Sequence, residues 1–317
     1  MNSRNINALL NNANSTSSIF MNENSMNYNI SNMEIEIKNN KRPISFIGSI
    51  NNNGEAFDYA GGLDEDNLRN GFGILRLSDG SIFKGMFIHG HANGYGIFCY
   101  SKGDIYKGEF RNDEINGFGE YNYKKKTINS GYWVNSSLLG IGCEKWKDSF
   151  YLGCFLNGQK NGIGTYIWKN KSKYKGQWKN DNMDGYGIYS FSDGRQYIGE
   201  WKKNYMNGFG IYKWNTNNKK YFGFFKMGVK NGFGIFSSND KHVIGFWKEG
   251  KQNGFAKYIT DKTIKYGFYN NGKREKWYET DNDFLEDFVK FDKDAKFKTF
   301  FEMDKISVEN YLLSKDL

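Results

Sequence analysis

Aromatic residues and glycines alternate with polar residues along much of the chain. In the segment YKGQWKNDNMDGYGIYSFSDG, which begins at Tyr174, the residues Tyr174, Gly176 and Trp178 occupy every second position. Residues two apart share one face of a β-strand, so this alternation predicts a strand with its aromatic residues on one face. The polar residues 179–184 predict a turn, and Gly185 marks the expected start of a second strand. The segment is therefore expected to form a β-hairpin.

The same pattern recurs along the chain. Its aromatic half begins at residues 59, 83, 106, 129, 151, 174, 197, 221 and 243, so that successive copies lie 22 to 24 residues apart. Its glycine half begins at residues 70, 93, 116, 139, 161, 184, 207, 231 and 253, usually as NGFG or a close variant. Degraded copies flank these nine units, FIGSI at 46 and KYGFY at 265. A fixed period of this length is typical of a repeat array with atypical end units.

The repeated pattern, Tyr-x-Gly-x-Trp followed seven residues later by Gly-x-Gly, resembles the MORN repeat (membrane occupation and recognition nexus). The resemblance covers roughly two thirds of the chain and is weakest in the unit at 129, where Asn129 replaces the aromatic residue and Leu139 the polar residue before the glycine pair. It implies a fold of stacked hairpins. It does not imply one activity, because such repeats occur both in free-standing scaffolds and attached to enzymes.

The glycines indicate how the hairpins pack. Glycine within a strand is tolerated where another group approaches the backbone closely. Gly176, Gly185 and Gly187 recur beside Tyr174 and Trp178, so we expect rings of one hairpin to lie flat over the glycine backbone of its neighbour. A single hairpin is not stable alone. The sequence therefore predicts an all-β fold, an elongated single-sheet solenoid of stacked hairpins in which nine units extend roughly 85 Å.

The two ends of the chain differ from the array. Residues 1–42 hold thirteen asparagines among the first forty and few aromatic residues, which predicts a disordered tail, and this bias is typical of AT-rich protist genomes. Residues 43–280 are expected to form the array. Within residues 281–317, Phe284, Leu285, Phe288 and Val289 fall at helical spacing. This segment predicts a short helical tail that covers the edge of the last hairpin or folds back across the sheet.

Composition and motifs favour a protein without catalytic, cofactor or metal sites. The three cysteines have no CxxC spacing, no apolar run approaches 18 residues, and neither a leader peptide nor an N-myristoyl signal is present, so we expect a cytoplasmic protein that is not secreted. Each Gly-x-Gly pair leads into another strand, whereas a phosphate-binding loop needs a helix there. His89 and His91 form the one close histidine pair, and a third metal ligand is not near them in sequence.

Charge is distributed unevenly along the chain. Residues 121–280 carry 28 basic and 11 acidic residues, whereas residues 44–120 carry 6 and 11, and residues 281–317 carry 6 and 10. In the repeats, the residue after the Trp or Phe is often cationic. With Lys203, these residues form the predicted partner or anionic-lipid surface: Arg111, Lys179, Lys202, Lys203, Lys226 and Lys248. Because the units stack in register, we expect a basic stripe along one edge, with a second basic edge formed by lysines in the connections, among them Lys124 and Lys169.

Several interpretations of this surface remain open. A solvated basic surface would keep the sheet soluble without any further role. Anionic phospholipid, an acidic protein surface and the acidic end of a second copy in a homodimer are candidate partners, whereas nucleic acid is disfavoured because the strand aromatics are needed for the core. The acidic tail could also cover the basic repeats. The favoured function is a non-enzymatic scaffold or adaptor at the cytoskeleton or a membrane surface. The alternative is a regulatory or targeting subunit of an enzyme on another chain.

The predicted solenoid can be tested by its radius of gyration. A 317-residue globule has a radius of gyration of about 20 Å. Small-angle X-ray scattering should give a clearly larger value for this chain, since stacked hairpins grow along one axis. A radius near that of the globule would contradict the predicted solenoid.

Overall fold

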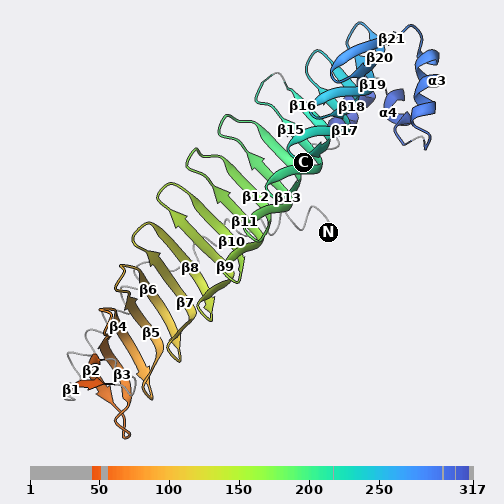
Figure 1. Cartoon of the computed structure of the whole chain (residues 1–317). Helices are drawn as coiled ribbons and strands as arrows, with labels where there is room; N and C mark the ends of the chain where they lie inside the picture. The colour runs from red at the N-terminus through yellow and green to blue at the C-terminus, as the bar shows by residue number, and fades with distance from the viewer. Residues whose placement is uncertain (1–44, 51–55, 217, 295, 304, 314–317) are drawn as a thin grey trace. The chain divides into compact units, whose positions relative to one another are not determined.

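The structure is a computed structural model that describes residues 45–50, 56–216, 218–294, 296–303 and 305–313. Figure 1 shows its strands and helices. The segment 1–42, expected to be disordered, lies outside the described residues. The described chain divides into two compact units. The first contains the described residues up to Ser101 together with residues 109–114, and the second contains residues 102–108 and those from Ile115 onward.

The fold is built almost wholly from short strands. The first unit contains β1 (Ser45–Ile50), β2 (Ala56–Leu63), β3 (Arg69–Arg76), β4 (Ile82–Ile88) and β5 (His91–Cys99), and β6 (Ile105–Arg111) has residues in both units. The second unit contains all of β7 (Glu114–Tyr123) but its first residue, together with β8 (Thr127–Val134), β9 (Ser137–Trp146), β10 (Phe150–Leu156), β11 (Gln159–Ile167), β12 (Lys173–Lys179), β13 (Asn182–Ser190), β14 (Gln196–Lys202), β15 (Tyr205–Lys213), β16 (Lys220–Lys226), β17 (Val229–Ser237), β18 (His242–Lys248), β19 (Lys251–Ile259), β20 (Ile264–Asn270) and β21 (Lys273–Tyr278).

Within each unit the strands pair antiparallel with their neighbours in the chain. In the first unit this series runs from β1 to β5, and in the second from β7 to β21. In the described part of the chain, three short helices follow the last strand: α3 (Asp281–Phe291), α4 (Lys298–Glu302) and α5 (Lys305–Leu313). The predicted all-β hairpin solenoid with a short helical tail is therefore confirmed.

The turn inside each hairpin is tighter than the sequence suggested. β12 continues to Lys179 and β13 begins at Asn182, so the expected turn over 179–184 and strand start at Gly185 are wrong. The turn consists of Asn180 and Asp181, whose φ angles are 47° and 62°. Two consecutive positive φ values define the type I′ turn, which matches the twist of antiparallel strands. Asn and Asp tolerate this conformation better than most residues, which explains the polar segment.

The two glycines of each Gly-x-Gly pair have different roles. Gly185 has a φ of +103° and lies in a bulge of β13, where residues 184–186 stand opposite the single residue Gln177 of β12. This backbone conformation favours glycine whatever surrounds it. Gly187 is different, because a Cβ atom there would lie 2.4 Å from the ring of Tyr174. The expectation that all three glycines of the unit make room for rings is therefore wrong for Gly185.

Each repeat tyrosine covers glycines of its own hairpin. Gly176 and Gly187 pair across the hairpin formed by β12 and β13, and the Tyr174 ring lies over both. The tyrosine hydroxyl donates a hydrogen bond to the carbonyl oxygen of Gln177 at 2.9 Å. The expected stacking on the neighbouring hairpin is therefore wrong for the tyrosine. The tyrosine side chain bends over its own strand, so its ring reaches the glycine pair of its own hairpin.

The tryptophans connect one hairpin to the next. The Trp201 Nε1 donates to the carbonyl oxygen of Gly187 in the preceding hairpin at 3.2 Å. The Trp201 ring also packs edge to face against Tyr174 and Tyr197, at centroid distances of 5.4 and 5.2 Å. Such pairs contribute about 0.5 to 1.5 kcal/mol each beyond their buried area. Repetition of these contacts produces a continuous ladder of buried rings from Tyr151 to Trp247.

The unit at 129 forms a hairpin without its tyrosine. β8 and β9 pair as in the other units, and Trp133 still donates to the carbonyl oxygen of Gly119. The space beside the glycine pair is filled by Leu138, and the Phe155 ring of the next hairpin lies 3.2 Å from the position of a Cβ atom on Gly142. Among the ring pairs of the described residues, Phe155 pairs with Tyr151 of its own hairpin, and Trp146 of β9 packs against Tyr166 of the next hairpin at a centroid distance of 5.6 Å.

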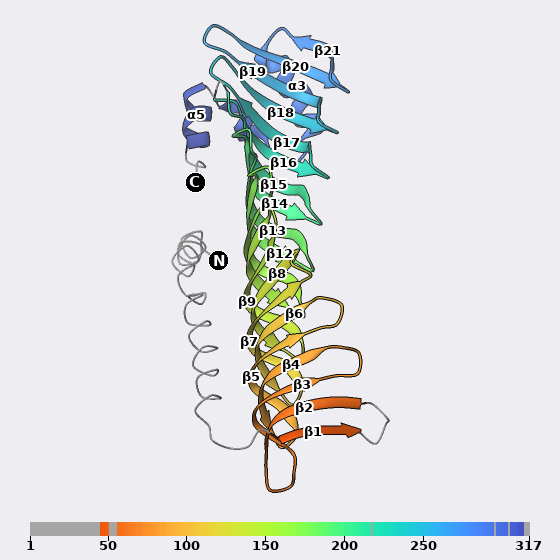
Figure 2. The same ribbon diagram turned by 90° about the vertical axis from the view of Figure 1, so that its left-hand side faces the viewer.

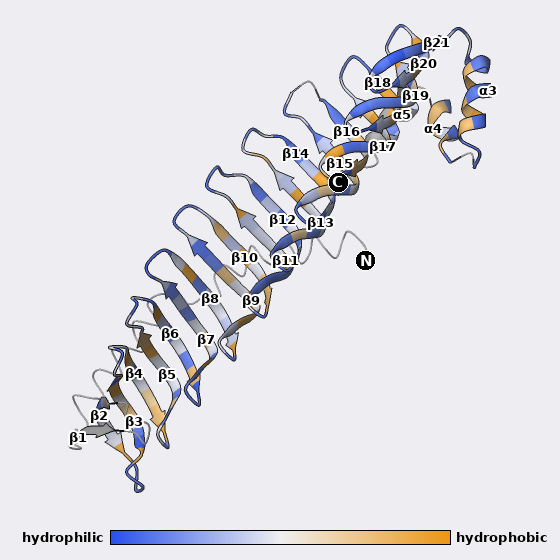
Figure 3. Cartoon of the chain, in the orientation of Figure 1, coloured by the Kyte–Doolittle hydropathy of each residue, from blue (hydrophilic) through white to orange (hydrophobic). Residues whose placement is uncertain are grey.

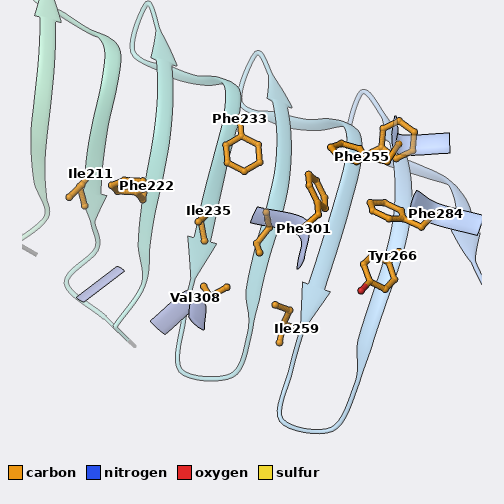
Figure 4. Close-up of a cluster of buried hydrophobic side chains, with 12 residues drawn as sticks. Ile211, Phe222, Phe233, Ile235, Phe255, Ile259, Tyr266, Phe284, Phe301 and Val308 are labelled. Atoms are coloured by element: carbon orange, nitrogen blue, oxygen red, sulfur yellow. The ribbon is translucent and has the colours of Figure 1, made fainter. Parts of the chain in front are cut away.

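The helical tail packs on the face of the sheet opposite the ring ladder. Phe284 and Phe288 of α3, Phe301 of α4 and Val308 of α5 are buried against strands β15 to β20, as Figure 4 shows for Phe284, Phe301 and Val308. Figure 2 shows α5 beside the strands. Both hydrophobic and hydrophilic residues lie along α3, as expected of a helix with one buried side (Figure 3). None of the described helices has the length and apolar character needed to cross a bilayer.

The glycine pair predicts a test of ring packing. Gly187→Ala should destabilise the protein by about 2 to 3 kcal/mol, because the Tyr174 ring must leave its place. Urea unfolding measures the loss, and Lys179→Ala at an exposed strand end is the control. The effect of Gly187→Ala should shrink when Tyr174 is also Ala, and a cost unchanged in that background would disprove the assigned contact.

Candidate functional site

The sheet of the second unit has two different faces. Its strand ends form two long sides, which we call its edges. The ladder face carries the rings that follow the pattern of Tyr174 and Trp178, and the open face carries the alternate residues, such as Lys175. The turn edge contains the two-residue turns, such as Asn180 and Asp181, and the connection edge contains the loops between hairpins, such as residues 191–195.

The predicted basic residues lie mainly on the turn edge. Lys179, Lys202, Lys226 and Lys248 are the last residues of β12, β14, β16 and β18, and all four are exposed. We call these four residues the lysine stripe. With two strands per hairpin, successive lysines are separated by about 10 Å. Lys203 lies beside the stripe as the first turn residue of its hairpin. Arg111 ends β6 in the equivalent way but belongs to the first unit.

Hydrogen bonds between hairpins hold the turn edge in place. The backbone N–H of Asp181 donates to the carbonyl oxygen of Lys160 in the preceding hairpin at 3.1 Å, and its carboxylate accepts from the Lys160 N–H at 2.9 Å. Asn204 makes the same two contacts with Met183 one hairpin further on. Because these contacts repeat, the spacing of the lysine stripe is fixed by the backbone.

Other lysines lie on the connection edge, as expected. Lys124 and Lys125 form the turn between β7 and β8, and Lys169 and Lys171 lie between β11 and β12. Lys169 pairs with Asp148 at 3.1 Å. The second unit thus presents cations along both edges of its sheet.

The two histidines singled out in the sequence bind different carboxylates. His89 Nδ1 lies 2.9 Å from Asp64 Oδ2, and His91 Nδ1 lies 2.6 Å from Asp113 Oδ2. In the part of the chain that the structure describes, no cluster of three or more His, Cys, Asp or Glu side chains is arranged to hold a metal ion.

Two lysines on the ladder face were missed by the sequence reasoning. Lys160 and Lys230 stand opposite Phe155 and Phe225, where the neighbouring units have Met183 and Met206. Lys160 Nζ lies 2.6 Å from a carboxylate oxygen of Glu144. Lys230 Nζ lies over aromatic rings at centroid distances of 4.6 to 5.9 Å: Tyr221, Trp214, Phe236 and Trp247. Burial lowers the pKa of Lys230 to about 8.

The apolar character of the open face was also missed. The residue between the two glycines of each Gly-x-Gly pair lies on this face. It is Phe118 in β7, Ile141 in β9, Tyr186 in β13 and Phe209 in β15. The signal for it was the apolar residue that stands between the glycines of each NGFG motif.

Taken together, these features define a repeat protein of stacked β-hairpins whose core is a ladder of rings over glycine pairs. The chain belongs to the MORN-repeat family. The model of that repeat matches more than half of the chain, at residues 65–82, 83–105, 106–127, 151–173, 174–194, 197–219, 221–243 and 244–261. It does not match the unit that lacks the tyrosine at Asn129.

Comparisons with other proteins add little beyond the family. No curated protein matches the chain. Among solved structures, the chain is similar to the TCP domain of SAS-4 (dCPAP) of Drosophila melanogaster in complex with a proline-rich motif of Ana2 (dSTIL), at 15% identity and a TM-score of 0.31, covering 56% of this chain and 92% of that one. It is also similar to streptogramin B lyase at 12% identity and a TM-score of 0.14, covering 76% and 86%. Neither likeness is close enough to support a functional argument.

The buried ammonium of Lys230 predicts a pH-dependent stability. Its folded pKa of about 8 lies below the ordinary value of 10.5. Between these values the unfolded chain binds the proton that the folded chain has lost, so this group's contribution to stability rises with pH across the window. Below pH 8 the buried charge costs about 3 kcal/mol, which the ring contacts offset by about 1 to 2 kcal/mol.

Lys230→Met should therefore raise the melting temperature at pH 7 by about 2 to 4 °C, because methionine fills the equivalent position in two neighbouring units. The gain should be much smaller at pH 10, because most of the window between the folded pKa of about 8 and the ordinary value of 10.5 has then been crossed. Differential scanning calorimetry at both pH values measures this, with the exposed Lys202→Met as control. An equal shift at pH 7 and pH 10 would show that titration of Lys230 has no part in the effect.

Proposed function

We propose that this chain is a non-enzymatic scaffold or adaptor that organises other proteins at the cytoskeleton or at a membrane surface, and that its basic repeats bind anionic phospholipid. The observation that supports the lipid contact is the lysine stripe, which places four exposed ammonium groups at a regular spacing along one rigid edge. Membership of the MORN-repeat family agrees with a scaffold role.

The energetics of such a contact are favourable at moderate salt. Each lysine held near an anionic leaflet contributes about 1 kcal/mol, so the stripe supplies about 4 kcal/mol. Salt screens this attraction over about 8 to 10 Å. Binding should therefore be reversible and should weaken as ionic strength rises. A rigid edge loses less side-chain and backbone freedom on binding than a flexible basic segment would.

A charge-reversal experiment tests the lipid contact. In the full-length chain, Lys179→Glu, Lys202→Glu, Lys226→Glu and Lys248→Glu together should abolish sedimentation with phosphatidylcholine vesicles that contain phosphatidylserine. The reason is that four attractive charges become repulsive along the contact edge.

The matched control makes the same change of net charge on the connection edge. It replaces Lys124, Lys125, Lys169 and Lys171 with Glu, and should retain sedimentation at low salt. Equal loss in both variants would indicate a response to net charge alone, and retained binding by the stripe variant would rule out the stripe as the lipid contact.

A further inference from the structure

The open face of the second unit is covered at one end and uncovered further along. The middle residue of each Gly-x-Gly pair, or of Gly-x-Ala at residues 254–256, provides a measure, because it occupies the same position in each hairpin. Phe233 and Phe255, beneath the tail, are 7% and 5% exposed, whereas Tyr186 is 56% exposed. The same apolar position is therefore part of a closed core in the last hairpins and part of the surface in β13.

The tail shows what kind of segment this face accepts. Helix α3 buries Phe284 and Phe288 against Phe255, at centroid distances of 5.5 Å for both pairs, and leaves Asp281 and Asp283 exposed. At the other end of the tail, Tyr311 of α5 packs edge to face on Phe222 of β16. The occupant is thus a helical segment with aromatic residues on its buried side and carboxylates on its outer side.

The tail also makes polar contacts with the sheet. Lys257, buried on the open face, donates from Nζ to the carbonyl oxygens of Phe301 and Met303 at 2.7 and 2.8 Å. Asp287 pairs with Lys276 of β21 at 3.1 Å. Cations of the sheet therefore meet acceptors of the tail, around a contact that is otherwise apolar.

The apolar row that holds the tail continues beyond it. Ile211 belongs to the buried cluster beneath the tail and pairs with Phe222 on one side. On its other side it pairs with Ile198, which in turn pairs with Ile188. Both isoleucines are only partly buried, and the exposed Tyr186 ring lies on the same face. The strip formed by Tyr186, Ile188 and Ile198 therefore continues the tail-binding surface in the direction in which the tail ends.

Cations border this strip. Lys179 and Lys202 end their strands on the open face at the turn edge, and Lys175 and Lys173 lie on the same face nearer the connection edge. Two carboxylates also lie there, but each accepts a backbone hydrogen bond from the sheet: Asp184 from the N–H of Lys203 and Glu200 from the N–H of Phe209. The positively charged border is thus complementary to an acidic segment, and the chain's own tail is such a segment.

We propose that the open face over β11 to β15 binds an acidic amphipathic helix of a partner protein, which lies in line with the chain's own tail. Its apolar side covers Tyr186, Ile188 and Ile198, and its carboxylates face the lysines along the border. This is the helix-in-groove mode of recognition, in which a few apolar anchors supply affinity and the charged border supplies orientation. It goes beyond the proposed lipid contact because it uses the face of the sheet and a protein partner.

The test uses a peptide of known sequence as the probe. A fluorescein-labelled peptide of residues 281–302 is titrated with the full-length chain, and fluorescence anisotropy reports binding. The Ile188→Glu/Ile198→Glu variant should bind at least tenfold more weakly, because two carboxylates would enter the apolar strip. The matched control is Val289→Glu in the full-length chain, at an exposed position of α3. This variant should bind the peptide as the wild type does.

Two further measurements keep the test decisive if the isoleucine variant folds poorly. Lys173→Glu/Lys175→Glu should weaken binding several-fold while Tyr186, Ile188 and Ile198 are kept, and a peptide with its Asp and Glu residues changed to Lys should not bind. Unchanged affinity in the isoleucine variant would place the peptide on the tail's own site or on the lysine stripe and would overturn the proposal, as would no detectable binding by the wild type. Vesicle sedimentation by the isoleucine variant should be normal, so failure of this proposal and failure of the lipid contact are distinguishable.

Discussion

The structure depends on one packing arrangement, a tyrosine ring that lies over a pair of glycines facing each other across a hairpin. The absence of side chains at Gly176 and Gly187 lets the Tyr174 ring lie against the backbone of both strands. The ring is then fully buried although the sheet is a single layer. Burial of one aromatic side chain contributes about 2 to 3 kcal/mol, and it recurs in almost every hairpin. The glycines lose more conformational entropy on folding than other residues would, and the buried rings outweigh that cost.

Much of this arrangement could be predicted from the sequence, because it repeats. The alternation of Tyr174, Gly176 and Trp178 placed them correctly on one face, and the 22- to 24-residue spacing gave the hairpin repeat. The details that failed depend on backbone geometry. The bulge at Gly185 and the two-residue turn at Asn180 change the local register, and that change decides which glycines a ring can reach.

The long-range contacts were less predictable for a different reason. The helical character of residues 281–291 was readable from the spacing of Phe284 and Phe288, but their docking site required knowing which face of the sheet is apolar. The burial of Lys230 likewise depends on rings from three neighbouring hairpins. The predicted lysines are at equivalent strand ends because their positions follow from the repeat alone. The lipid and partner roles assigned to them are hypotheses that the fold permits.

The missing tyrosine at Asn129 has a consequence for how the second unit unfolds. In a repeat protein each hairpin is stabilised mainly by its two neighbours, so the free energy of unfolding is close to a sum of internal and interface terms. The interface after β8 and β9 lacks the tyrosine ring pair of the later interfaces, such as Tyr174 with Trp201, and Trp146 with Tyr166 is the ring pair that crosses it. The loss of the tyrosine ring pair therefore lowers the coupling between the hairpins before and after it. Under force or denaturant, the array should separate into two folding blocks at this position.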